Sequence, residues 1–197
     1  MPANDFDLLN VLREAGALKS GHFLLSSGRH SDQYIEKFDL LRNPRATEQA
    51  CQAIAELFRL SAVDVVVGPT TGGIILAFEV GRQLGCMAAY AERKTDGSPG
   101  REIRRGTTFS PGQKVLVVDD ILTTGGSVRE TLTALKHQPV DIIAVAVLVD
   151  RSGGKVSFGA TPLVALSTLD VKTWDPCDCD LCAKGIPVIK PGTTNVV

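Results

Sequence analysis

The feature that most constrains the fold is residues 114–127, which read KVLVVDDILTTGGS. Residues 115–118 predict a buried parallel strand, because this run is too apolar to alternate between a wet and a dry face. A short turn of small Thr and Gly residues follows, and Ser127 and Val128 open a helix. A strand, a Gly-rich turn and a helix in this order are typical of an α/β protein.

Two acids, Asp119 and Asp120, stand where this strand is predicted to end. Open α/β sheets bind ligands at that edge, where carboxylates can accept hydrogen bonds from ribose hydroxyls. The backbone N–H groups of residues 123–126 and the positive end of the helix can hold a phosphate. The chain has no G-x-G-x-x-G and no G-x-x-x-x-G-K-[ST] motif, which argues against dinucleotide and P-loop sites. We therefore predict a sugar-phosphate site rather than a solvated acidic corner.

The rest of the chain continues the alternation of strand and helix, which predicts a mainly parallel sheet with helices on both faces. Strands are expected at residues 63–67, 87–91, 114–118, 141–149 and 163–166. Helices are expected at residues 5–15, from Pro44 onward, and at 74–84 and 128–137. Loops or irregular β-like structure are expected at 21–40, 68–73 and 92–111. The 197 residues fit a single domain. Its expected core is about 41–169, with a small hood from 1–40 plus 170–197.

Two of the expected helices carry start signals. Asp5 is the expected N-cap of the first, and Asn43 followed by Pro44 is a strong N-terminus for the second. The second helix is expected to bury one face, made of Ala50, Ile54, Leu57 and Phe58.

Composition excludes some classes of protein. A net charge of −1 gives no general attraction to nucleic acid or to an anionic membrane. No apolar run approaches a membrane span, and the N-terminal residues lack the pattern of a signal peptide. We expect a cytoplasmic protein whose five cysteines are reduced thiols or metal ligands.

Two further segments could bind anions. The polar segment 92–106 is rich in cations, four of which are suited to a leaving pyrophosphate, although a solubilising hairpin is the alternative. These cations are Arg93, Lys94, Arg104 and Arg105. The turn at residues 67–73, VGPTTGG, could bind pyrophosphate through its N–H groups or could simply be a tight turn.

Arg151 follows the strand expected at 141–149, at the same edge of the sheet as the two acids. Its guanidinium is suited to a planar carboxylate, although a surface arginine in a turn is the alternative.

A cysteine cluster lies near the C-terminus: Cys177, Cys179 and Cys182. Thiolates at this spacing can bind zinc, but a closed structural site usually has four ligands, so His22 or His30 would have to complete it. A tight turn with half-buried thiols is the alternative, and the sequence alone favours it.

The stretch 114–127 resembles the PRPP-binding signature of the type I phosphoribosyltransferases. Residues 21–34 resemble the F-x-L-x-S-G-x-x-S-x-x-Y segment of the orotate phosphoribosyltransferases. The matching positions are Phe23, Leu25, Ser27, Gly28, Ser31 and Tyr34. The resemblance spans nearly the whole chain and implies the type I phosphoribosyltransferase fold. It also implies transfer of the 5-phosphoribosyl group from PRPP to N1 of orotate, with Mg²⁺, in a homodimer whose active sites are shared across the interface.

The resemblance assigns roles to particular residues. Asp119, Asp120, Arg93 and Lys94 would be catalytic, and Thr123, Arg151, Ser27 and Tyr34 would bind orotate. The PRPP-binding set would be Asp119, Asp120, Ile121, Leu122, Thr123, Thr124, Gly125, Gly126, Ser127, Arg93, Lys94, Arg104, Arg105, Thr70, Thr71 and Gly72.

The chain departs from the best-known bacterial branch of this family. Ser26 stands where that branch has a lysine, Thr71 and Gly72 stand where it has a Tyr-Lys pair, and the polar loop lacks its second lysine and histidine. Arg104 and Arg105 could replace these cations. Two alternatives stay open: another base in the same fold, or a regulator that binds PRPP or a nucleotide without catalysis.

Overall fold

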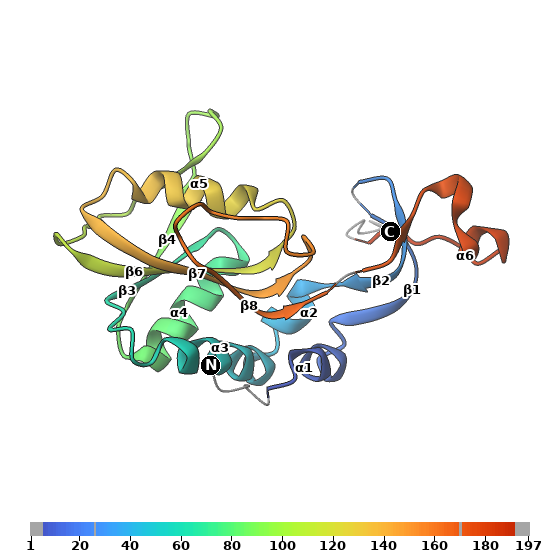
Figure 1. Cartoon of the computed structure of the whole chain (residues 1–197), viewed down its shortest axis with the longest axis horizontal. Coiled ribbons are helices and arrows are strands. Elements are labelled where there is room, and N and C mark those ends of the chain that lie inside the picture. Colours follow the sequence, from blue (N-terminus) through green and yellow to red (C-terminus); the bar gives the residue numbers. More distant parts are fainter. Residues whose placement is uncertain (1–5, 26, 170, 192–197) are drawn as a thin grey trace.

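The computed structural model describes residues 6–25, 27–169 and 171–191 (Figure 1). Its body is a six-stranded sheet in the order β5-β4-β3-β6-β7-β8, and the neighbours are parallel except for the antiparallel β4–β5 pair. The strands are β3 (Val65–Pro69), β4 (Met87–Arg93), β5 (Arg101–Ile103), β6 (Gln113–Leu122), β7 (Val140–Asp150) and β8 (Leu163–Thr168). The predicted mainly parallel sheet is confirmed.

Helices cover both faces of this sheet. The helices α3 (Pro44–Phe58) and α4 (Gly72–Leu84) lie against one face, and α5 (Gly126–Leu135) lies against the other (Figure 1). Each face has its own apolar cluster. Val66 packs toward Ile54 and Leu76 on the α3–α4 side, whereas Val67 packs toward Leu132 on the α5 side. Successive side chains of β3 thus point to opposite faces of the sheet, as they do in any β-strand.

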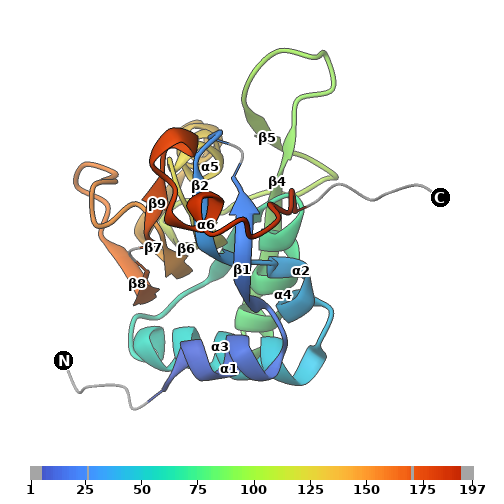
Figure 2. The ribbon, with the colours of Figure 1, turned by 90° about the vertical axis from the view of Figure 1, so that its right-hand side faces the viewer.

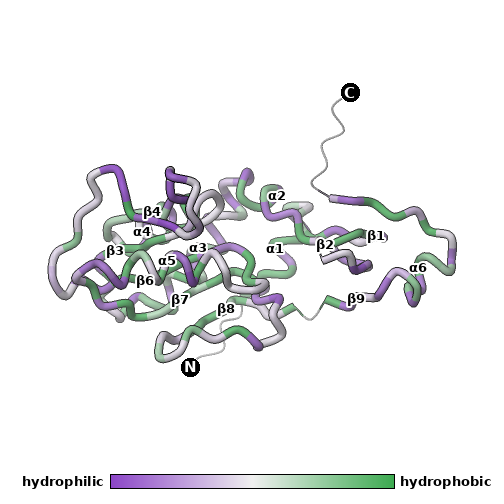
Figure 3. The backbone as a smooth tube through the Cα atoms, turned by 90° about the horizontal axis from the view of Figure 1, so that it is seen from above, coloured by the Kyte–Doolittle hydropathy of each residue, from purple (hydrophilic) through white to green (hydrophobic). Residues whose placement is uncertain are grey.

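A second, three-stranded sheet joins the two ends of the described chain. It contains β1 (Leu18–Leu24), β2 (His30–Ile35) and β9 (Thr173–Trp174), with β2 in the middle. The short helix α6 (Asp180–Ala183) follows β9, and this part stands apart from the larger body when seen from above (Figure 3). Figure 2 shows the C-terminal segment lying across the β1–β2 hairpin.

The helix α1 (Leu8–Glu14) packs against α3 and also against the small sheet, because the cluster that buries it contains Leu18 and Ile35. Leu8 and Leu12 are buried in the α3–α4 cluster. The helix α2 (Lys37–Leu41) then connects the small sheet to α3. The division into a core and a hood stays a prediction.

Several expected boundaries were wrong or shifted. The expected N-cap Asp5 lies outside the described residues; α1 begins at Leu8 and is capped by Asp7, whose side chain accepts from the Asn10 N–H. Asn43 does cap α3. Leu57 is 38% exposed, because the buried stripe of α3 passes through positions 50, 54 and 58 and leaves Leu57 beyond its edge.

The segment 21–40, expected to be irregular or β-like, contains strands and a helix, and the expected loop 92–111 contains a short strand. Residues 21–40 include most of β1, all of β2 and most of α2, and residues 92–111 include β5. The strand β6 continues through both acids to Leu122, and β3 and α4 leave only residues 70–71 between them. The helix α5 ends at Leu135, before the expected 137. Within the described ranges, the structure contains no helix long and apolar enough to cross a bilayer.

Candidate active site

The two acids of β6 are buried at the centre of the carboxyl edge of the sheet. Asp119 is 9% exposed and Asp120 is 4% exposed. Burial, and next the negative charge of Asp120, raise the pKa of Asp119 to about 7. The Oδ1 atom of Asp120 accepts the N–H of Ile121 at 2.7 Å, which fixes the orientation of this carboxylate. Two carboxylates in one dry pocket favour an incoming cation or hydrogen-bond donors.

Lys37 is a neighbour of this pair that the sequence analysis missed. Its Nζ atom lies 2.9 Å from Oδ2 and 3.2 Å from Oδ1 of Asp120. Lys37 comes from α2, the connection between the small sheet and the core. It matched no motif, and the segment around it was expected to be irregular.

The raised pKa of Asp119 predicts a pH dependence of stability. In the unfolded chain this pKa is about 3.9, so between about pH 4 and pH 7 the folded protein binds more protons. The free energy of unfolding should therefore fall as pH rises through this window. Between pH 5 and pH 8, the decrease in the free energy of unfolding should be smaller in Asp119→Asn than in the wild type by at least about 1 kcal/mol. Asp120, Lys37 and Arg101, which also face Asp119, remain in the variant.

Denaturant unfolding of the substrate-free protein at several pH values measures this difference. Equal pH slopes in the wild type and the Asn variant would show that Asp119 does not titrate abnormally.

The turn after β6 forms a cavity suited to a phosphate. A hollow of about 260 Å³ is lined by Arg93, Asp119, Glu130 and residues 121–128, which include the first turn of α5. Gly125 has φ +77°, and a Cβ atom there would lie 2.9 Å from the Val156 side chain. Only glycine combines that backbone conformation with so little space. Backbone N–H groups and the N-terminus of a helix favour an anion here.

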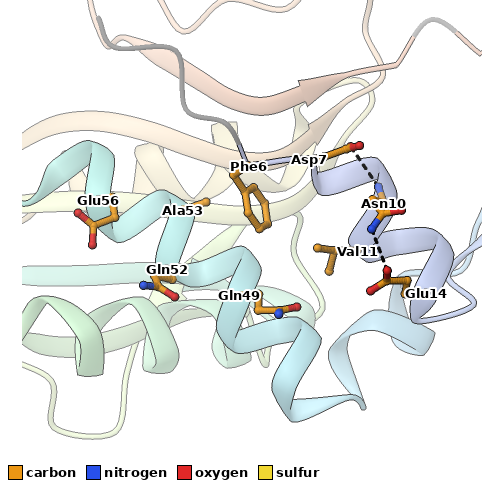
Figure 4. Close-up of a pocket in the computed structure, with 9 residues that line it drawn as sticks. All are labelled: Phe6, Asp7, Asn10, Val11, Glu14, Gln49, Gln52, Ala53 and Glu56. Atoms are coloured by element: carbon orange, nitrogen blue, oxygen red, sulfur yellow. Dashed lines mark hydrogen bonds between the residues drawn. The ribbon is translucent and has the colours of Figure 1, made fainter.

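A larger hollow of about 500 Å³ lies elsewhere, between α1 and α3 (Figure 4). The residues drawn there include the acids Asp7, Glu14 and Glu56, but none of the described lining residues is cationic. A phosphorylated ligand would meet carboxylates without compensating charge, so we do not assign the sugar-phosphate site to it.

The β3–α4 turn meets the acids directly. A Cβ atom on Gly72 would overlap Oδ2 of Asp120, so Gly72 provides the space in which this carboxylate sits. Thr70 donates its N–H to the Ala91 carbonyl at 3.0 Å, and the Thr70–Thr71 peptide bond is cis. Thr71 is exposed at the start of α4. The departure from the family pattern at position 72 thus coincides with a close contact to Asp120.

Gly72→Ala is expected to move the Asp120 carboxylate and to lower kcat/KM for PRPP about tenfold or more, because misplacement by 1 Å can cost that much. Stability should change little, since alanine is a good helix former and the displaced atoms are side-chain ends. The matched control is Gly81→Ala, the same change in the same helix beside Ala88. Steady-state kinetics compares the two variants, and equal loss in both would contradict this role of Gly72.

Arg101 is a second residue that the sequence analysis did not single out. It is 5% exposed, and burial lowers its pKa. Its Nη1 donates to Thr70 Oγ1 at 2.8 Å and its Nη2 to Ser127 Oγ at 3.5 Å. Arg101 therefore ties the β3–α4 turn to the start of α5. The sequence offers no signal that separates Arg101 from the other cations of the segment. Its position follows from the pairing of β4 with β5, in which Arg101 lies opposite Arg93.

The four cations predicted for pyrophosphate lie in different surroundings on the β4–β5 hairpin, which projects from the body (Figure 1). Arg93 lines the phosphate cavity, and Lys94 is exposed just beyond β4. Arg105 pairs with Glu92 through bonds of 3.0–3.2 Å, and Arg104 lies 3.7 Å from Glu102. Within this chain, only Arg93 of the four lines that cavity.

Arg151 lies at the same edge, beside the end of β6. Its N–H donates to the Leu122 carbonyl at 2.8 Å. Its buried Nε has no hydrogen-bond partner among the described residues, and burial lowers the pKa of the guanidinium. Tyr34 of β2 lies close enough for Arg151 to influence its pKa, which burial raises. Thr123 is exposed at the phosphate cavity and Ser27 is exposed before β2. Ser26 lies outside the described residues.

The mainly parallel sheet, the buried acids at its carboxyl edge and the hollow at the turn beside them match what the resemblance to the phosphoribosyltransferases predicts. In agreement, residues 39–178 match the family "Phosphoribosyl transferase domain".

The relatives specify the group within that family. An orotate phosphoribosyltransferase of Caldicellulosiruptor saccharolyticus is 45% identical over 188 residues, which is 95% of this chain and 96% of that one. The orotate phosphoribosyltransferase of Thermotoga maritima is 43% identical, covering 94% and 97%. The crystal structure of the Aeropyrum pernix orotate phosphoribosyltransferase matches with a TM-score of 0.70 at 30% identity, over 83% and 94%. The chain belongs to the orotate phosphoribosyltransferases.

Proposed function

We propose that this protein transfers the 5-phosphoribosyl group of PRPP to N1 of orotate, giving orotidine 5-monophosphate and pyrophosphate. The observation that carries the proposal is the buried, unpaired Nε of Arg151 at the edge that also holds Asp119 and the phosphate cavity. A buried guanidinium N–H without a partner is costly, and a planar carboxylate such as that of orotate would satisfy it. The names of the relatives support the same base.

In the proposed complex, the 5-phosphate occupies the turn of residues 123–127 and the ribose hydroxyls donate to Asp119 and Asp120. Loss of pyrophosphate leaves positive charge on the ribose ring, and the two carboxylates stabilise it from close range. Lys37 must release Asp120 for this contact. Orotate is held by Arg151 and Thr123, and Tyr34 and Ser27 cover the base; this is mainly an effect of orientation. The proposed inversion at C1 needs no covalent bond to the protein.

The leaving pyrophosphate is proposed to contact Arg93, Lys94 and the turn of Thr70, Thr71 and Gly72. Arg104 and Arg105 join it only if the hairpin rearranges, because Arg105 is bound to Glu92. We further propose that a homodimer brings the hairpin of one chain to the site of the other, and that the enzyme is cytoplasmic. Residues 41–169 would form the catalytic core, and 1–40 with 170–197 the hood over the base.

The site also fits Mg²⁺, which we propose as the metal of the reaction. Two buried carboxylates compete for limited positive charge, and oxygen is the donor that Mg²⁺ prefers. Asp119 and Asp120 would hold the ribose beside the ion. When bound, Mg²⁺ stabilises the negative charge of the leaving group as a Lewis acid.

A comparison of bases tests the proposal. Purified protein with PRPP and Mg²⁺ should phosphoribosylate orotate at least a hundredfold faster than uracil, because uracil lacks the carboxylate for Arg151. Adenine should not react measurably. A preference for uracil or adenine would refute the proposed base, and PRPP binding without turnover of any base would favour the regulatory alternative.

A further inference from the structure

Four potential metal ligands meet beside the small sheet, and none of them lines the phosphate cavity. They form what we term the His–Cys cluster: His22, His30, Cys179 and Cys182. The ligand atoms of all four lie within 4.8 Å of one another. The histidines come from β1 and β2, and the cysteines come from residues about 150 positions later in the chain. Cys177, which the spacing offered only as a candidate ligand, is exposed and does not belong to the cluster.

The distances suit a single ion at the centre. Cys179 Sγ lies 3.4 Å from His22 Nε2, Cys182 Sγ lies 3.3 Å from His30 Nδ1, and the two ring nitrogens are 2.9 Å apart. A tetrahedral Zn²⁺ with nitrogen and sulfur ligands places those ligands roughly 3.3–3.8 Å from one another. Slight expansion of the cluster would accommodate the ion.

The tautomer of His22 is fixed by its other nitrogen. Nδ1 lies 2.7 Å from the Ile186 carbonyl, which can only accept, so Nδ1 carries a proton and Nε2 is the nitrogen that a neutral ring would offer to a metal. Around Nε2 stand His30 Nδ1 and both sulfurs. A hydrogen bond from one neighbour could satisfy Nε2 of His22. A metal ion, by contrast, would be bound by all four ligand atoms at once. A carbonyl behind a ligating histidine is also the usual second contact of a metal site.

Burial and charge favour zinc over a surface cluster. Three of the four ligands are buried: His22 is 1% exposed, Cys179 is 3% exposed and His30 is 7% exposed, whereas Cys182 lies at the surface. Two thiolates and two neutral imidazoles neutralise a divalent ion, so the complete site carries no net charge into the interior. Binding would release the two thiol protons to solvent.

The described part of the C-terminal segment buries little apolar surface, and polar contacts of Arg29 with Thr173 and Asp175 help to hold it. Ile186, Val188 and Ile189 are 42–57% exposed, and β9 pairs with β2 over two residues. Two backbone hydrogen bonds join Ile189 to β1. Small units with so little buried apolar surface usually depend on a metal or a disulfide.

We propose that the His–Cys cluster is a structural Zn²⁺ site that fastens the C-terminal segment to the β1–β2 hairpin. It is separate from the proposed Mg²⁺ site and does not depend on the proposed reaction. The occupant is a zinc-like divalent ion with tetrahedral preference, since two sulfur and two imidazole donors match neither Mg²⁺ nor Ca²⁺.

Metal analysis of the full chain tests the proposal. The protein is reduced with a phosphine, incubated with one equivalent of ZnCl₂, desalted and measured by inductively coupled plasma mass spectrometry. The wild type and Cys177→Ser should each retain about one zinc per chain. Cys179→Ser and His22→Ala should lose most of it.

Co²⁺ substitution gives a test that needs no destabilising variant. The wild type and Cys177→Ser should show the thiolate-to-Co²⁺ charge-transfer band and the intense visible bands of a tetrahedral site. Removal of the ion by a chelator should lower Tm in both. A wild type that retains no zinc, a Co²⁺ spectrum without thiolate bands, or equal loss of zinc in Cys177→Ser would overturn the proposal.

Discussion

Asp120→Asn is expected to lower kcat/KM for PRPP by roughly two to three orders of magnitude, the size of the effect when one group that stabilises transition-state charge is removed. The amide keeps the shape of the carboxylate but loses its negative charge. It can neither accept as strongly from a ribose hydroxyl nor stabilise the cationic ring. The burial of Asp120 makes the loss large, because solvent cannot replace the missing charge.

Steady-state kinetics and PRPP binding should both register the change. The matched control is Asp141→Asn, which alters an exposed acid near the start of β7, at the opposite edge of the sheet. The control should keep wild-type kinetics. An Asp120→Asn enzyme within threefold of the wild type would show that this carboxylate does not act on the ribose.

Arg151→Ala is expected to raise the KM for orotate about 10- to 150-fold, since a hydrogen bond to a charged group contributes about 1.5–3 kcal/mol. The KM for PRPP should change little. Arg151→Lys should recover part of the affinity, because lysine keeps the charge but cannot form paired bonds to a carboxylate. A variant with unchanged orotate affinity would refute the assignment of Arg151.

Arg129→Ala is the matched control for Arg151→Ala. Arg129 is an exposed arginine of α5 that donates to the Ser157 carbonyl and stacks on Phe158. The Arg129→Ala substitution also removes one positive charge, but from a side chain that does not contact the proposed base. Equal effects of both changes would point to a general loss of positive charge rather than to a specific contact.

The sequence predicted those parts of the fold that depend on local patterns. The apolar runs of β3, β6 and β7 are buried on both faces in a parallel sheet, so they stand out as nearly continuous hydrophobic segments. Asn43 and Pro44 define the start of α3 by their own chemistry. The position of the phosphate turn follows from β6, because the strand, the glycines and the helix are consecutive.

The remaining features depend on contacts between distant segments. Lys37 reaches Asp120 only because α2 folds against the core, and Arg101 reaches Thr70 only because β5 pairs with β4. Neither contact leaves a signal in the spacing of residues. Leu57 differs from Ile54 and Phe58 by its angle around α3, which decides exposure once the helix packs.

The cysteine cluster shows the same difference between local spacing and tertiary contact. The spacing of the three cysteines suggested Cys177 as a ligand, whereas the structure assembles two of the cysteines with both histidines. The partners come from a hairpin at the other end of the chain, and pairing of β2 with β9 brings them together.

Consumption of orotate, followed by its ultraviolet absorbance, tests the central claim most directly. Purified protein with PRPP and Mg²⁺ should deplete orotate, the depletion should require all three components, and Asp120→Asn should abolish most of it. No depletion by a wild-type protein that binds PRPP would contradict the proposed reaction.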